Sequence, residues 1–89
     1  MEHVLDQPRV LLGRGPGVDL ALEDPSLERV HAALEFHGSG YGVRHLAEEG
    51  DLVVNGASVA WCELKDEDRF QLGTVVFAYL LEARRPLTL

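Results

Sequence analysis

Two arginines in the first third of the chain occupy positions where a guanidinium group could hold an anion. Arg14 follows Gly13, and Arg29 stands two residues before His31. The residues around both arginines have the composition of loops, and guanidinium groups fixed on neighbouring loops can bind phosphate through paired, charge-assisted hydrogen bonds. The spacing of these residues therefore predicts a phosphate-binding site.

Acidic residues stand beside this pair in the sequence. Glu28 directly precedes Arg29, and the segment 47–51 contains Glu49 and Asp51. An ionised carboxylate can accept a hydrogen bond but cannot donate one, and it repels a phosphate. Two interpretations therefore stay open for Arg14 and Arg29: contact with a phosphorylated ligand, or salt bridges to carboxylates of the chain itself.

The pattern of reactive residues does not predict a catalytic, metal-binding or nucleotide-binding site. The single cysteine, Cys62, has no histidine or aspartate spaced to activate it. His3, His37 and His45 lie on different segments without the spacing of a zinc site. The glycines between residues 13 and 17 precede neither a helix nor the lysine of a nucleotide-binding loop. We therefore expect no enzyme activity, no cofactor and no metal.

Composition narrows the choice of partner and compartment. The chain has 89 residues, 46% of them hydrophobic, which suits one small domain. A net charge of −7 argues against nucleic acid as a partner. The longest apolar run, residues 75–81, is too short to span a membrane, and no signal peptide is visible. The single cysteine fits a reducing compartment, so the expected location is cytoplasmic.

Short apolar runs alternate with turn residues at intervals of about ten residues, which is typical of an all-β sandwich. The expected strands cover residues 9–12, 18–22, 32–36, 41–45, 52–54, 57–61, 69–72 and 75–81. Residues 27–36 also have helical spacing, but the glycines at 38 and 40 favour a hairpin and hence a strand. The dipeptide Asn55-Gly56 predicts a tight turn. We expect one domain over residues 1–89, with a core at about 9–82 and a tail or domain edge at 83–89.

The ordered motifs together resemble a forkhead-associated (FHA) domain. The matching segments are Gly13-Arg14, Val18 to Leu22, Arg29 with His31-Ala32, Leu46, Val54-Asn55-Gly56, Leu64 to Asp68, and Leu72-Gly73. The resemblance implies an eleven-stranded β-sandwich of two antiparallel sheets, with ligand loops at one end. The chain begins late relative to the family pattern, so the first strand is expected to be missing, shortened or built from residues 1–5.

Members of this family typically bind phosphothreonine peptides. The resemblance implies phosphate or peptide contacts for Arg14 and Arg29. It implies loop-bracing roles for four further residues, which are Gly13, His31, Asn55 and Gly56. The expected partner is then a phosphorylated protein, bound in signalling.

Departures from the family pattern keep a second function open. Glu28 stands where the family has serine, and Glu49 and Gly50 fall in the segment where it has threonine and asparagine. A degenerate FHA domain could act as a phospho-independent assembly or scaffold domain, for example in a larger secretion or regulatory complex. Its partner would be an unphosphorylated protein. An exposed sheet edge could also pair with a second copy of the chain.

Overall fold

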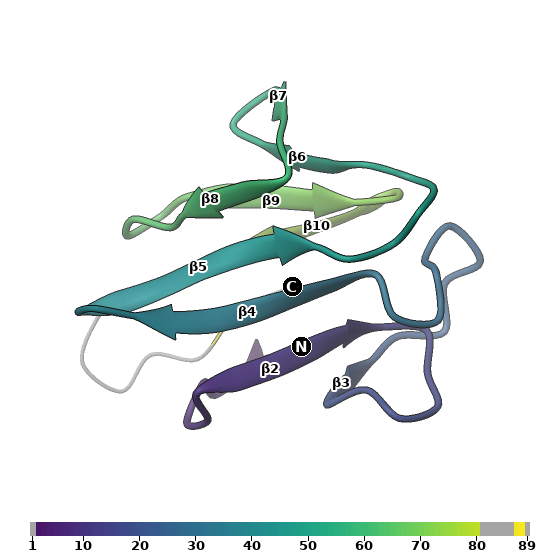
Figure 1. The fold of residues 1–89 in the computed structure, drawn as a ribbon, viewed down its shortest axis with the longest axis horizontal. Coiled ribbons are helices and arrows are strands. Elements are labelled where there is room, and N and C mark those ends of the chain that lie inside the picture. The colour runs from purple at the N-terminus through teal and green to yellow at the C-terminus, as the bar shows by residue number, and fades with distance from the viewer. Residues whose placement is uncertain (1, 81–86, 89) are drawn as a thin grey trace.

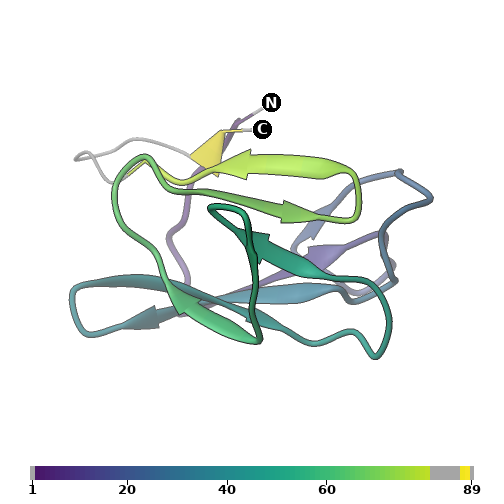
Figure 2. The ribbon, with the colours of Figure 1, turned by 90° about the horizontal axis from the view of Figure 1, so that it is seen from above.

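Eleven strands in two packed sheets make up the described part of the protein. The structure, a computed structural model, describes residues 2–80, 87 and 88. The strands are β1 (Glu2–His3), β2 (Arg9–Gly13), β3 (Leu20–Ala21), β4 (Ala32–His37), β5 (Gly40–His45), β6 (Leu52–Val54), β7 (Ala57–Ser58), β8 (Trp61–Glu63), β9 (Arg69–Leu72), β10 (Val75–Ala78) and β11 (Leu87–Thr88). Figure 1 shows β2, β4 and β5 side by side, and Figure 2 shows the two layers from above. The expected all-β sandwich is confirmed.

The five-stranded sheet has the order β3-β2-β4-β5-β8. Its centre is the hairpin of β4 and β5, which turns at Gly38 and Ser39 as the glycine pattern predicts. One pairing differs from the expected antiparallel sheets, because β3 runs parallel to β2. Asp19 supports this pairing: its carboxylate accepts the backbone N–H of Leu11 at 2.8 Å, and its own N–H donates to the Leu11 carbonyl at 3.0 Å.

The six-stranded sheet has the order β1-β11-β10-β9-β6-β7. Strand β1 is only two residues long, in line with the expectation of a shortened first strand, and it pairs with β11. The sequence predicts no strand in the tail at 83–89, yet residues 87 and 88 form β11 between β1 and β10. The remainder of that tail, residues 83–86 and 89, lies outside the described residues.

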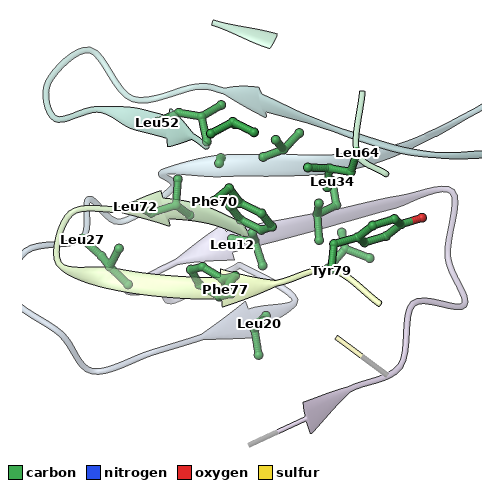
Figure 3. Close-up of a cluster of buried hydrophobic side chains, with 14 residues drawn as sticks. Leu12, Leu20, Leu27, Leu34, Leu52, Leu64, Phe70, Leu72, Phe77 and Tyr79 are labelled. Carbon is green, nitrogen blue, oxygen red and sulfur yellow. The ribbon is translucent and has the colours of Figure 1, made fainter. Parts of the chain in front are cut away.

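The core lies between the two sheets, and its buried residues come chiefly from β2, β3, β4, β5, β6, β9 and β10. Figure 3 shows the cluster, in which Phe70 and Phe77 from neighbouring strands stack with ring centroids 4.9 Å apart. Leu12 and Leu34 face them from the other sheet and are 1% and 0% exposed. Burial of these side chains supplies the main stabilisation of the sandwich.

Several expected strands differ from the observed ones. The strand expected at 57–61 is split, since β7 belongs to the six-stranded sheet and β8 to the other. The strand expected at 18–22 is reduced to Leu20–Ala21, and the one at 75–81 ends at Ala78, with residue 81 outside the described part. The helical alternative for 27–36 is absent, because 27–31 form a loop that leads into β4.

None of the described segments is a helix long and apolar enough to cross a membrane. The described residues contain strands, turns and bends only. The sandwich therefore positions any site through its loops and sheet faces.

Candidate functional site

Three loops meet at one end of the sandwich. They are residues 14–19 after β2, residues 22–31 before β4, and residues 46–51 after β5, and Figure 1 shows them at the same end of these strands. The first two loops are joined by their backbones: Arg14 N–H donates to the Glu28 carbonyl at 2.9 Å, and Gly15 N–H donates to the Arg29 carbonyl at 3.1 Å. The two arginines of the sequence motifs therefore lie on adjoining segments.

Gly13 lies where the loop before β4 crosses the end of β2. A β-carbon at Gly13 would overlap the backbone carbonyl of Arg29 and touch that of Glu28 at 3.0 Å. Because backbone atoms cannot rotate away as a side chain can, this close approach requires glycine. Gly13 thus sets how near the loop of Arg29 comes to Arg14.

His31 ties two of the three loops together and is fully buried. Its Nδ1 accepts the backbone N–H of Glu28 at 3.1 Å, so the neutral ring carries its proton on Nε2, which donates to the Asp51 carbonyl at 3.2 Å. Its backbone carbonyl accepts from Leu46 and Ala47, at 3.0 and 3.1 Å. One residue therefore connects the loop before β4 with the loop after β5.

Gly50 allows the loop after β5 to close over this histidine. Its φ of +80° is a left-handed conformation that glycine adopts without strain. A β-carbon here would lie 3.1 Å from Cε1 of the His31 ring. The residue that replaces the family's asparagine thus fits the loop conformation and the buried ring.

Neither Arg14 nor Arg29 forms a salt bridge with another residue of the described range 2–80. The ion pairs within residues 2–80 join Arg9 and Arg44 to Glu35, and His37 to Glu63. Arg14 and Arg29 are exposed and belong to none of them. Of the two interpretations drawn from the sequence, internal pairing with Glu28 or Glu49 is therefore absent from the described residues, and both guanidinium groups are available to a ligand.

The same end of the molecule also carries exposed carboxylates. Glu28, Glu49 and Asp51 are all exposed to solvent. At such positions their charges are screened by water and salt, and a side chain can rotate away from a bound anion. The three loops at this end of the sandwich therefore carry two arginines without an ion-pair partner among residues 2–80, together with exposed carboxylates.

The hydroxyl of Ser26 links the loop before β4 to the other sheet, a contact that the sequence did not predict. Ser26 Oγ donates to the Asp24 carboxylate at 2.6 Å and accepts the backbone N–H of Thr74 at 2.9 Å. The hydrogen bonds from Ser26 hold the pKa of Asp24 below its usual 3.8. The Asp24-Pro25-Ser26 turn signals the local bond, but Thr74 is 48 residues away and has no sequence signal.

Asn55 and Gly56 form the expected turn, with φ of +49° and +87°. Asn55 Nδ2 donates to the Asp68 carboxylate at 3.2 Å, and its N–H donates to the Arg69 carbonyl, also at 3.2 Å. The turn follows β6, whereas the loop at 46–51 precedes it. Asn55 therefore links the end of β6 to β9, and these two hydrogen bonds do not reach the loops of Arg14 and Arg29.

The remaining reactive residues form no metal-binding group in the part of the chain that the structure describes. No cluster of three or more histidine, cysteine, aspartate or glutamate side chains is arranged to hold a metal ion within these residues. Cys62 is partly buried, and its thiol donates to the Glu63 carbonyl at 3.3 Å. The arrangement at the loop end suits binding of an anionic group.

Comparison with known proteins gives this geometry a context. Residues 1–83 match the family described as "Inner membrane component of T3SS, cytoplasmic domain". The glycogen accumulation regulator GarA of Mycolicibacterium smegmatis is 30% identical over 77 residues, which cover 86% of this chain and 49% of GarA. The chain therefore spans about half the length of this curated relative.

Two solved structures extend the likeness to three dimensions. The FhaA FHA domain, crystallised with the intracellular domain of Rv3910, is 26% identical with a TM-score of 0.77, over 83% of this chain and 81% of that one. The FHA-2 domain of the Mycobacterium tuberculosis ABC transporter Rv1747 is 25% identical with a TM-score of 0.75, over 91% and 75%. The FHA fold expected from the motifs is thereby confirmed.

Proposed function

Because this chain belongs to the family of cytoplasmic domains of the T3SS inner membrane component and has the FHA fold, we propose that it is an interaction domain for phosphothreonine-containing protein segments. Arg14 and Arg29 bind the phosphate, and the loops at 14–19, 22–31 and 46–51 receive the flanking peptide. The role is binding rather than catalysis, and the family description supports a cytoplasmic setting.

The observation that carries this proposal is the freedom of the two guanidinium groups. Both are exposed, and neither takes part in an ion pair among residues 2–80, although Glu28 and Glu49 are near in sequence. An arginine that has no internal partner keeps its hydrogen-bond donors for a ligand. Gly13 and His31 hold the backbones of these loops at fixed positions, which limits the entropy lost on binding.

A second candidate function is phospho-independent assembly within a secretion complex. The description of the matched family supports it, and so do the exposed carboxylates of Glu28 and Glu49 at the loop end. A dianionic phosphate near these groups is repelled, by about 1 kcal/mol for each charge pair at 4 Å in water. An unphosphorylated partner is not penalised in this way.

An NMR titration separates the two functions. Labelled protein is titrated with a phosphothreonine peptide library and with the same library unphosphorylated. If the protein binds phosphothreonine, the amide chemical shifts of Arg14, Arg29 and residues 47–51 should change with the phosphorylated library only. Both Arg14→Gln and Arg29→Gln should abolish these changes, whereas Arg69→Gln, an exposed arginine on β9, should keep them.

The contrary result is equally clear. If no phosphate-dependent shift is seen at millimolar peptide, the phosphate-reader function is wrong. Equal shifts with both libraries, unchanged by Arg14→Gln, would favour phospho-independent assembly.

A further inference from the structure

The outer face of the five-stranded sheet carries a row of interacting side chains away from the ligand loops. Arg9 on β2 lies directly opposite Glu35 on β4, and Arg44 on β5 lies directly opposite Trp61 on β8. Glu35 also lies opposite Gly42, two residues before Arg44. Directly opposed and alternate residues share one face of a sheet, so the row crosses four strands on the side away from the core.

Trp61 lies flat on this face because Gly42 has no side chain. A β-carbon at Gly42 would overlap the Trp61 ring. The Arg44 guanidinium lies over the ring, 4.7 Å from its centroid, and His37 meets it edge-on at 6.2 Å. Cation–π contact and close packing hold the indole and the guanidinium in one arrangement before any partner arrives.

Glu35 holds the two arginines of the row through one nitrogen each. Its Oε1 accepts from Arg44 Nε at 2.9 Å, and its Oε2 lies 3.5 Å from Arg9 Nε. The Glu35 side chain is 27% exposed, whereas those of Arg9 and Arg44 are 55% and 48% exposed. Neither arginine has a further hydrogen bond or ion pair within residues 2–80. The terminal Nη donors of both guanidinium groups are therefore free.

These side chains line a hollow of about 410 Å³, which has an apolar margin. Pro8 lines it together with Trp61, whose ring is partly exposed. Exposed aromatic surface beside charged donors is typical of places where a protein partner binds. The hollow therefore offers both anion donors and apolar contact.

We propose that this hollow binds an unphosphorylated acidic segment of a protein partner. Aspartate or glutamate carboxylates accept from the free Nη donors of Arg9 and Arg44, and apolar residues of the same segment lie against Trp61 and Pro8. Two arginines face a single carboxylate in the lining of the hollow, in a chain of net charge −7. This local positive excess is complementary to acidic peptide.

Two other occupants fit the charges less well. Nucleic acid is disfavoured by the overall charge of −7. A second copy of the chain could offer its own acidic loop at 47–51. Both occupants are separate outcomes of the experiment below.

Trp61 is the only tryptophan of the chain, so its fluorescence reports on the hollow directly. The probes are short capped peptides in which aspartate and glutamate alternate with proline, leucine and phenylalanine, and a matched set with asparagine and glutamine. Saturable changes in Trp61 emission and in the amide shifts of Gly42 and Arg44 are expected with the acidic set only. Arg9→Gln and Arg44→Gln should each weaken binding about tenfold, because each removes a charge-assisted contact.

Matched variants keep this proposal separate from the phosphate site. Arg69→Gln, on the other sheet, and Arg14→Gln, in the ligand loops, should leave acidic-peptide binding unchanged. An equal response to both peptide sets, or an equal loss with Arg69→Gln, overturns the proposal. It is also overturned if the hollow responds only to an oligonucleotide, if the signal depends on protein concentration alone, or if no saturation occurs at millimolar peptide.

Discussion

The buried imidazole of His31 accepts a hydrogen bond from the backbone N–H of Glu28, which directly precedes Arg29. The N–H to Nδ1 distance is 3.1 Å, and the opposite ring nitrogen donates to the Asp51 carbonyl at 3.2 Å. Both ring nitrogens are therefore satisfied in the neutral state. Two loops that carry exposed charges depend on one side chain that contacts no solvent.

Replacement of His31 by alanine should destabilise the whole sandwich. The change leaves a partly buried N–H and a partly buried carbonyl without partners and opens a cavity, so we expect a loss of about 2–4 kcal/mol in the free energy of unfolding. Urea denaturation measures it. The exposed His37 is the matched control, and His37→Ala should change stability by less than about 0.5 kcal/mol. Equal effects of the two variants would contradict the bracing role.

Asp24 should make stability depend on acid pH. Hydrogen bonds from the side chain and the backbone of Ser26 lower its folded-state pKa below 3.8. A carboxyl with a depressed pKa stabilises the fold above its unfolded-state value, and this contribution is lost as the pH falls through the lower, folded value. We expect unfolding free energies measured from neutral pH to below 3.8 to fall more steeply for the wild type than for Asp24→Asn.

A second variant separates the carboxylate from the rest of this contact. Ser26→Ala removes the hydroxyl that links Asp24 to Thr74, so it should reduce stability at neutral pH and flatten the acid dependence. The backbone bond from Ser26 to Asp24 remains, so some dependence should survive. Parallel acid profiles for the wild type and Asp24→Asn would refute the assignment.

Elements that depend on local chemistry could be predicted from the sequence, whereas elements that depend on contacts between distant segments could not. The turn at Asn55 and Gly56 was predictable because few residues adopt positive φ, and both do so here. The switch of the chain from one sheet at Ala57–Ser58 to the other at Trp61–Glu63 could not be predicted. Half-buried Val59 packs against the core between them, so the apolar pattern reads as one continuous strand. Pairing of Glu2–His3 with Leu87–Thr88 joins the two ends of the chain and leaves no local signal.

The same distinction applies to the candidate site. The loops of Arg14 and Arg29 could be located from glycine and turn residues, since these mark where strands end. Whether the arginines pair with Glu28 or stay free depends on side-chain positions that spacing alone does not determine. The row from Arg9 to Trp61 was also hidden, because it joins four strands that meet only through the sheet register.

Gly13→Ala should displace the loop that carries Arg29. Its new β-carbon would overlap the Arg29 carbonyl, and overpacking of this kind costs about 1–3 kcal/mol. We expect lower stability in denaturant and weaker phosphopeptide binding. Gly40→Ala is the control, because its β-carbon would meet only Tyr79 Oη, at an ordinary 3.7 Å. If Gly13→Ala retains full stability and affinity, close approach of the backbones is not required.

Glu28→Ser should strengthen phosphothreonine binding. The change removes an exposed carboxylate beside Arg29 and introduces the serine that the FHA sequence pattern has at that position. Loss of like-charge repulsion and gain of a hydrogen bond to phosphate together predict an increase in affinity of about tenfold or more. Calorimetry with one phosphopeptide from the library measures it. Stability should hardly change, because His31 is bonded to the backbone N–H of Glu28 and not to its side chain.

Two further variants decide what such an increase means. Glu23→Ser removes an exposed carboxylate of equal charge from the same loop, at a position outside the segments that match the family pattern, so a smaller effect is expected if the hydroxyl matters. Gly50→Asn restores another family residue, but it places a side chain at φ +80° and 3.1 Å from the His31 ring. It should therefore lower stability by about 1 kcal/mol even if affinity rises. Equal gains in affinity from Glu28→Ser and Glu23→Ser would mean that only the net charge matters, and no gain from either would count against a phosphate site between Arg14 and Arg29.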